Sequence, residues 1–190
     1  GVEREYPRIA GISSFGAGGS NAHLVIEEYI EKESEKEHAI IIDEENPAMI
    51  VISAKSKEQV KEQADNLLKY IKANDYKDNE LADIAYTLQV GREAMDERLG
   101  FIVSSIKELK KKLKDYIDGK DDIDDLYEGH VKKSKETLEV FKNDKEFQKI
   151  TNTWMEKKKY GKLLELWVKG LEIDWRKLYS DEKPKRISLP

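Results

Sequence analysis

The stretch RIAGISSFGAGGSNAHLVIEE, residues 8–28, contains residues that suit a particular backbone shape. Between its two apolar runs lie four glycines: Gly11, Gly16, Gly18 and Gly19. Glycine adopts positive φ angles without steric cost, so such a cluster favours a tight turn and a close approach of the main chain to another group. The stretch therefore predicts a strand at 9–15, a glycine loop, and a second strand at 22–30.

The run SSFGAGGSNAH, followed by LVIEEY, resembles the closing hairpin of the ketosynthase domain in modular polyketide synthases. The resemblance covers residues 1–30 and implies that the body of a ketosynthase lies upstream of Gly1, so that the chain is an excised piece of a longer protein. In that family the glycine loop borders the acyl-binding pocket. By resemblance, six residues line or support this pocket: Phe15, Gly16, Ala17, Gly18, Gly19 and Asn21. Ala17 is smaller than the residue often found there, so no gating role is carried over to it.

Condensation by a ketosynthase needs a nucleophilic cysteine and two histidines, because the thiolate must be activated by its neighbours. This chain has no cysteine, and its three histidines, His23, His38 and His130, do not resemble the catalytic motifs of the family. We therefore expect no catalytic residue, no metal and no cofactor in this chain. Phosphopantetheine would belong to the carrier domains of the parent synthase.

Composition limits the remaining possibilities. Lys and Arg number 34 and Asp and Glu 39, which gives a net charge of −5 over 190 residues. Such a mixed surface argues against a nucleic-acid partner and for a soluble protein. No apolar run is long enough to cross a bilayer, and no signal peptide is recognisable. The lack of cysteine fits a reducing compartment, so we expect a cytoplasmic protein.

The centre of the chain predicts a small α/β layer. Apolar, β-branched runs indicate strands at 49–54 and 98–104, with a weaker third strand at 126–131. Ser56, with Gln59 three residues later, marks the start of a helix that runs to Ala73. Further helices are predicted at 81–91 and 106–119, each ended by a glycine. The expected fold is a three-stranded sheet covered by helices on one face, followed by a helical segment.

Two other stretches carry a second resemblance. LADIAYTLQVGREAMDERLGFIV, residues 81–103, and WVKGLEIDWRKLY with KPKRISLP near the end resemble the linker that follows the ketosynthase in polyketide synthases. No GxSxG motif of an acyltransferase follows, which resembles the trans-acyltransferase class, where this region is called a flanking or docking subdomain. The implied organisation is a ketosynthase hairpin at 1–30, a charged linker at 31–47, the α/β subdomain at 48–133, and at 134–190 a helical segment and tail that return over the ketosynthase.

Aromatic residues near the end are candidates for a core or a domain interface. The candidates are Trp154, Tyr160, Trp167, Trp175 and Tyr179. A basic cluster follows at Lys183, Lys185 and Arg186, which predicts a solvated tail, with docking to an acidic surface as the alternative.

The sequence thus favours a non-catalytic scaffold that packs on the ketosynthase of the same polypeptide and positions neighbouring domains. Docking of a discrete malonyl acyltransferase, and contact with acyl carrier domains, are further hypotheses. Two alternatives stay open: an acyl-transfer fragment with its own acyl-binding activity that uses His23 or His130, and an interaction module unrelated to polyketides.

Overall fold

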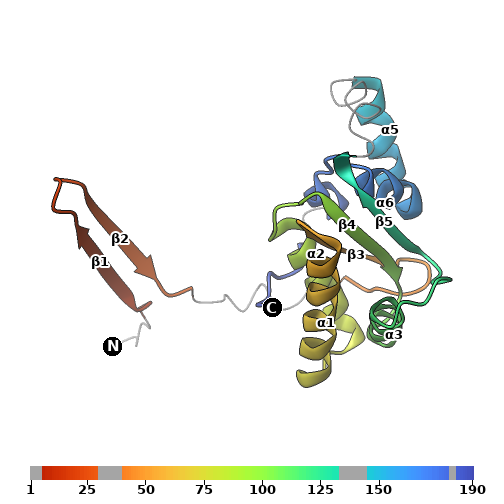
Figure 1. Cartoon of the computed structure of the whole chain (residues 1–190), viewed down its shortest axis with the longest axis horizontal. Helices are drawn as coiled ribbons and strands as arrows, with labels where there is room; N and C mark the ends of the chain where they lie inside the picture. The colour runs from red at the N-terminus through yellow and green to blue at the C-terminus, as the bar shows by residue number, and fades with distance from the viewer. Residues whose placement is uncertain (1–5, 30–39, 133–144, 180–182) are drawn as a thin grey trace, which may run out of the picture. The chain divides into compact units, whose positions relative to one another are not determined.

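The computed structural model describes residues 6–29, 40–132, 145–179 and 183–190. The chain forms two compact units, Gly1–His38 and Ala39–Pro190 (Figure 1), and each is described by itself. Most of the charged stretch predicted as a linker, with His38, and the start of the predicted helical segment lie outside the described residues.

The first unit is a two-stranded hairpin, as predicted. Strand β1 (Ile9–Phe15) pairs antiparallel with β2 (Asn21–Glu27), and Ile12 lies opposite Leu24. Every residue of both strands is exposed. Because side chains alternate between the faces of a strand, the apolar residues divide between both faces of the hairpin.

The second unit is built on a three-stranded antiparallel sheet. Strands β3 (Ala48–Ala54), β4 (Glu97–Val103) and β5 (Leu126–His130) lie in the order β3-β4-β5. Ile50 lies opposite Phe101 and Leu99 lies opposite Glu128. The weak third strand of the sequence prediction is therefore a member of the sheet.

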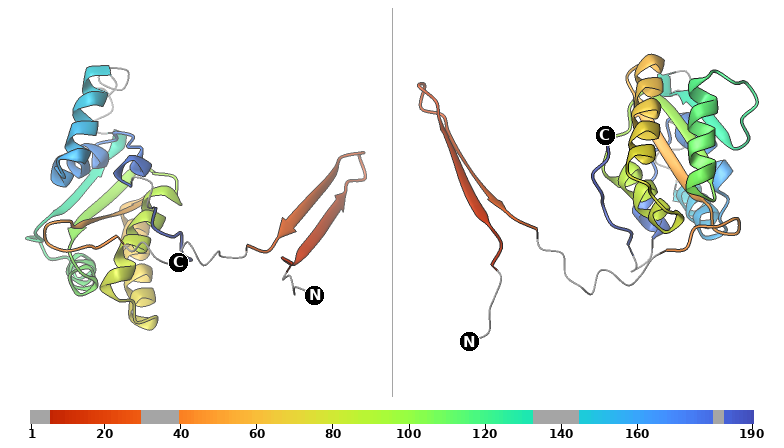
Figure 2. Two further views of the ribbon diagram at one scale, coloured as in Figure 1. Left: turned by 180° about the vertical axis from the view of Figure 1, so that it is seen from behind. Right: turned by 90° about the horizontal axis from the view of Figure 1, so that it is seen from below.

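Two helices cover one face of this sheet: α1 (Lys57–Ala73) and α3 (Ile106–Ile117), which pack side by side (Figure 2). The Ser56 hydroxyl accepts a hydrogen bond from the Gln59 N–H, as the capping pattern predicts. Ser105 begins α3 in the same way, through the Glu108 N–H. The ring of Phe101 meets Tyr116 of α3 edge to face, with centroids 6.2 Å apart.

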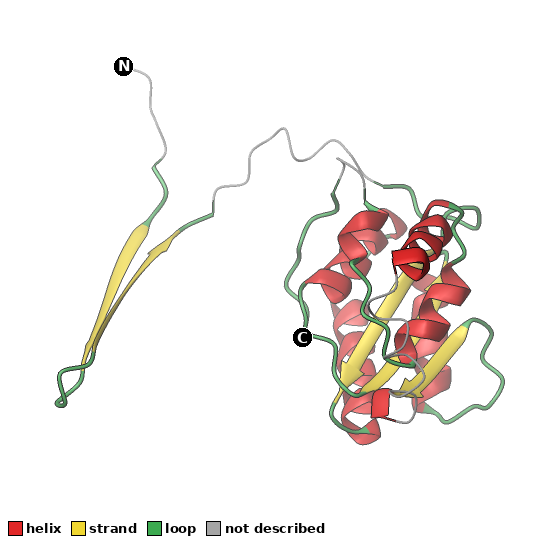
Figure 3. Ribbon diagram, turned by 90° about the horizontal axis from the view of Figure 1, so that it is seen from above, coloured by secondary structure: helices red, strands yellow, loops and turns green. Residues whose placement is uncertain are grey.

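The C-terminal helical segment closes the opposite face, so helices lie on both sides of the sheet (Figure 3). Helix α6 (Tyr160–Val168) packs against β4 and β5, and α5 (Lys145–Glu156) packs against α6. A Cβ at Gly100 would lie 2.9 Å from a methyl carbon of Leu164. Glycine at this position therefore lets α6 approach the sheet closely. The predicted α/β class with a three-stranded sheet and a C-terminal helical segment is confirmed.

Helix α2 (Leu81–Val90) lies along β3, after a 3₁₀ turn η2 (Asp78–Glu80). The side chain of Gln89 donates to the Met49 carbonyl at 2.8 Å and so fixes α2 to the sheet. A second 3₁₀ turn, η3 (Trp175–Leu178), packs against α2 and α5. None of the helices in the described ranges is long and apolar enough to cross a membrane.

Candidate functional site

The last eight residues, 183–190, lie on α2 as an ordered extended segment, here called the C-terminal strap. The Lys185 N–H donates to the Asp83 carboxylate at 2.7 Å, and the Ile187 N–H donates to the Thr87 hydroxyl at 2.9 Å. Arg92 donates to the carbonyl oxygen of Pro190. Two extended residues rise about 6.6 Å and four helical residues about 6 Å, so the spacing of Lys185 and Ile187 matches about one turn of α2.

Apolar contacts add to these bonds. Pro184 is buried, and Ile187 and Leu189 pack against the core of the unit. The strap is thus held by its side chains as well as by its main chain. Residues of the strap are therefore held along α2 by both kinds of contact.

A buried polar relay holds the segment before the strap. The Tyr179 hydroxyl donates to Gln89 Oε1 at 2.7 Å, and the same amide donates to Met49. Burial raises the pKa of Tyr179 far above its ordinary value, so this phenol stays a hydrogen-bond donor. Its ring also meets Tyr86 edge to face, with centroids 5.0 Å apart.

Arg98 joins the sheet to the end of α6. From β4 its guanidinium donates to the carbonyls of Trp167, at 2.8 Å, and Leu171, at 3.1 Å. A third bond reaches the Met95 carbonyl at 2.9 Å. The carbonyls at a helix end lack partners within the helix and carry a partial negative charge, which suits a cation. Burial lowers the pKa of Arg98, but arginine remains charged.

The aromatic candidates gather around α6 and α2. Trp167 and Trp175 are only 3% and 7% exposed and meet edge to face, so both belong to the core of their own unit. Trp154 and Tyr160 are partly buried, and the Lys162 ammonium lies 5.4 Å from the centroid of the Trp154 ring. Tyr179 belongs to the relay described above.

The six candidate residues lie in the glycine loop or at the strand ends that it joins. The Gly16 N–H donates to the Ser20 carbonyl at 2.8 Å, and the Gly19 N–H donates to the Gly16 carbonyl at 3.0 Å. Gly19 has a φ of +90°, which requires glycine. Phe15 lies opposite Asn21 where the loop begins and is 79% exposed.

The hairpin also pairs Ser13 with His23, which the sequence reasoning missed. Ser13 Oγ lies 2.8 Å from His23 Nδ1, and the register of the hairpin sets the two residues opposite each other. Alternation counted back from the turn would have indicated this pair. A hydrolytic serine also needs a group that orients the histidine. Among the described residues, no carboxylate is hydrogen-bonded to His23.

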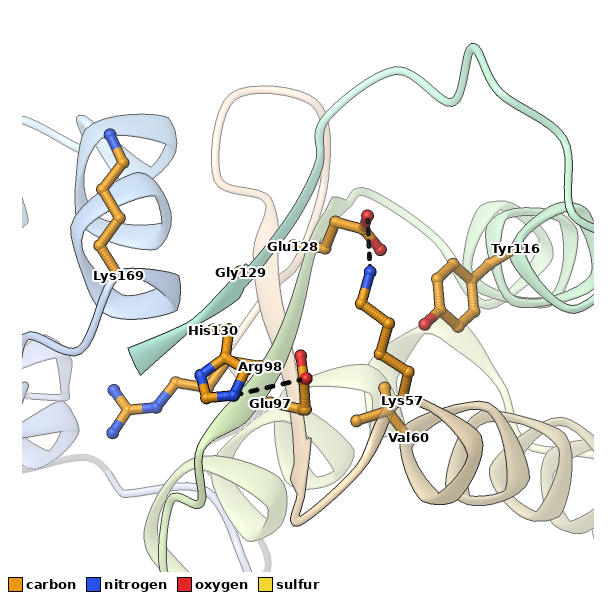
Figure 4. Close-up of a pocket in the computed structure, with 9 residues that line it drawn as sticks. All are labelled: Lys57, Val60, Glu97, Arg98, Tyr116, Glu128, Gly129, His130 and Lys169. Atoms are coloured by element: carbon orange, nitrogen blue, oxygen red, sulfur yellow. Dashed lines mark ion pairs between the residues drawn. The ribbon is translucent and has the colours of Figure 1, made fainter. Parts of the chain in front are cut away.

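A hollow of about 320 Å³ lies between β5 and the start of α1 (Figure 4). Two loose ion pairs line it: Lys57 with Glu128 at 3.9 Å, and His130 with Glu97 at 3.8 Å. Burial, with the nearby carboxylates of Glu128 and Glu97, raises the pKa of the Tyr116 hydroxyl. His130 Nδ1 accepts the Lys132 N–H at 3.1 Å. No serine, threonine or cysteine is among the residues that line the hollow, so His130 has no nucleophile to activate there.

Known proteins are similar to this chain over both of its units. The family model described as the RhiE-like KS-MAT linker domain matches residues 51–120. Polyketide synthases PksN and PksL of Bacillus subtilis are 51% and 48% identical over 98% and 100% of this chain. The chain spans only 3% and 4% of their lengths.

Solved structures show the same relationship. The ketosynthase from module 6 of the Bacillus subtilis bacillaene synthase is 41% identical, with a TM-score of 0.71, over 100% of this chain and 31% of that one. The ketosynthase from module 1 of the Bacillus amyloliquefaciens synthase is 36% identical, with a TM-score of 0.69, over 97% and 29%. The chain therefore belongs to the modular polyketide synthases, as a segment that comprises the end of a ketosynthase region and the linker after it.

Proposed function

We propose that this segment is a non-catalytic scaffold of a trans-acyltransferase polyketide synthase in the cytoplasm. It packs on the ketosynthase of its own polypeptide and sets the direction in which the chain continues. Carrier domains that bear phosphopantetheine are the partners whose position it controls. The observation that carries this proposal is the C-terminal strap, which is bonded to Asp83 and Thr87 of α2 and to Arg92 just after that helix.

The hairpin supports the ketosynthase part of the proposal. Its large apolar side chains are 48% to 79% exposed and lie on both faces: Ile9, Ile12, Phe15, Leu24, Val25 and Ile26. An isolated two-stranded hairpin is marginally stable in water. Apolar residues on both faces are typical of a strand pair covered from two sides, as in a larger core. We infer that the rest of the ketosynthase supplies this cover.

The positioning role can be tested by distance measurements between spin labels. The chain has no native cysteine, so labels at Lys61→Cys on α1 and Ser188→Cys on the strap would be specific. We expect one narrow distance distribution, which Thr87→Val broadens. A control pair, Lys61→Cys with Lys107→Cys on α3, should stay narrow in both backgrounds. A broad distribution in the parent chain would exclude a fixed exit and with it the positioning role.

A second proposal is that a discrete malonyl acyltransferase docks on this segment. The family model that matches describes a linker between a ketosynthase and an acyltransferase, which favours such a neighbour. The exposed basic residues Lys183 and Arg186 offer charges for an acidic surface. Calorimetry with the whole chain should show saturable binding that Lys183→Glu with Arg186→Glu weakens. Absence of heat with the parent chain would reject docking, while the distance test of the scaffold would still stand.

A further inference from the structure

Strand β5 is one of the two edge strands of the sheet, and its hydrogen-bonding pattern shows which main-chain groups point outward. The Ile102 N–H donates to the Asp125 carbonyl at 3.1 Å, and the Val131 N–H donates to the Asp96 carbonyl at 2.9 Å. In an antiparallel ladder, every second residue points its main-chain groups toward the neighbouring strand. Gly129 therefore faces β4, whereas Glu128 and His130 direct their N–H and C=O groups away from it.

The outward groups of these two residues are available. Within the part of the chain that the structure describes, no hydrogen bond reaches the main-chain groups of Glu128 or the N–H of His130. Two residues before Glu128 along this edge, the Leu126 N–H is satisfied by the Ile123 carbonyl at 3.4 Å. The open part of the edge is thus short and centred on Gly129. Unpaired edge groups of this kind can accept another extended segment.

The side chains at this edge are self-complementary. Glu128 and His130 project on the same face of β5, toward the hollow, with Gly129 between them (Figure 4). If two copies pair antiparallel with Gly129 opposite Gly129, each Glu128 lies opposite the other copy's His130. A carboxylate and an imidazole at directly facing positions can hydrogen-bond to each other, which stabilises a strand pair. At the centre, a Cβ on Gly129 would lie 2.6 Å from the Val168 carbonyl oxygen, so glycine there lets α6 cover the other face of β5.

We propose that β5 pairs with β5 of a second copy of this chain, around a two-fold axis at Gly129. This joins two three-stranded sheets into one sheet of six strands and uses the same patch on both copies, as a two-fold interface requires. Pairing centred on Glu128 instead would set two carboxylates against each other, which is unfavourable. The charges therefore select the register. The pairing links one segment to another, beyond the scaffold role within one polypeptide.

The main-chain part of the proposal is tested by sedimentation equilibrium of the whole chain with His130→Pro and His130→Ala. Proline removes the outward N–H and leaves the ladder to β4 intact, because that N–H is not used there. Alanine keeps the N–H. The symmetric dimer loses two hydrogen bonds, so proline should weaken self-association by ~10- to 100-fold relative to alanine. Circular dichroism would confirm that both variants keep the fold.

The charge part is tested by mixing two variants. Glu128→Lys sets lysine opposite histidine, and His130→Glu sets two glutamates opposite each other, so each variant alone should associate more weakly than the parent chain. In the mixture, the introduced lysine of one variant faces the introduced glutamate of the other, while the native Glu128 faces the native His130. Mixing should therefore restore association.

Hydrogen exchange gives an independent readout, because the main-chain amides at Glu128 and His130 should be protected only in the dimer. Equal association of the proline and alanine variants, or association without this protection, would overturn the proposal and assign the contact to the exposed hairpin. A chain that stays monomeric at all concentrations would also overturn it.

Discussion

The main-chain N–H of Ile187 donates a 2.9 Å hydrogen bond to the hydroxyl of Thr87, a residue 100 positions earlier in the chain. Thr87 lies in α2 and is only 8% exposed, so its side chain is largely shielded from solvent. A helix residue thereby fixes an extended segment that follows all the secondary structure of the described chain.

Thr87→Val should release the middle of the C-terminal strap. Valine keeps the shape of threonine and removes the acceptor, which leaves the Ile187 N–H without its partner. We expect a loss of about 1 kcal/mol in the free energy of unfolding, measured by urea titration with tryptophan fluorescence. Thr153→Val is the matched control, because the Thr153 hydroxyl bonds the Lys149 carbonyl within α5. Equal losses in both variants would argue against a specific anchor at Thr87.

Gly100→Val should push α6 away from the sheet. The added Cβ would lie 2.9 Å from a methyl carbon of Leu164, which is fully buried and cannot move aside freely. Overpacking of this kind costs about 1–3 kcal/mol. Leu164→Ala makes room for the added side chain. The double variant should therefore lose less free energy of unfolding than the sum of the two single variants, and a double-mutant cycle measured by urea titration should show this difference as a coupling energy. Strictly additive effects would contradict the close contact.

Arg98→Met should loosen the C-terminal end of α6. Methionine keeps an apolar stem but removes the guanidinium that binds the carbonyls of Trp167 and Leu171. We expect a loss of about 1–3 kcal/mol for a buried polar group left without its partner. Hydrogen exchange should accelerate at the end of α6 more than in α1. A uniform acceleration across both helices would indicate a general loss of stability instead.

Stability should fall on acidification through Glu108. Burial opposes its ionisation, but the hydrogen bonds from Ser104 and Lys112 outweigh burial and lower its pKa below 4.5. The stabilisation is fully present above about pH 4.5 and is lost as the pH falls through the lowered folded-state pKa. In Glu108→Gln this part of the pH dependence should be missing from urea titrations. If the free energy of unfolding of Glu108→Gln falls at acidic pH as steeply as that of the parent chain, other carboxylates cause the loss.

The Ser13 and His23 pair should not hydrolyse esters. It is exposed, and in the described residues His23 has no carboxylate bonded to it, so the serine lacks the support that activates such nucleophiles. The parent chain and Ser13→Ala should hydrolyse an activated ester at the same rate, close to that of buffer. A rate that depends on Ser13 would revive the acyl-transfer alternative.

The sequence predicted those parts of the fold that depend on local patterns. Ser56 with Gln59 marked the start of α1, and apolar runs marked β3 and β4, while β5 was predicted only weakly. The contact of Gly100 with Leu164 was not predictable, because it joins residues 64 positions apart and depends on how closely α6 approaches. The hydrogen bonds of Arg98 could not be predicted from the sequence for a related reason. Their acceptors are main-chain carbonyls, which have no signature in the side-chain sequence.

The strap was predicted only as a basic, proline-containing tail. Its anchors at Asp83 and Thr87 are ordinary helix residues, and only their spacing by one turn of α2, which matches that of Lys185 and Ile187, gives them a role. The glycine loop was the opposite case, since its residues alone indicated the turn that the structure contains.

The amide of Gln89 has a mechanical consequence. One side of it binds Met49, in the strand where the chain enters the second unit, and the other side binds Tyr179, where the chain turns toward its exit. Tension applied to the two ends of this unit would therefore act on this one amide as well as on the hydrogen bonds between β3 and β4. Lengthening a loop beyond β4 would leave the distance between the two attachment points unchanged. The unit can thus vary in its outer loops while Gln89 keeps β3 linked to the segment around Tyr179.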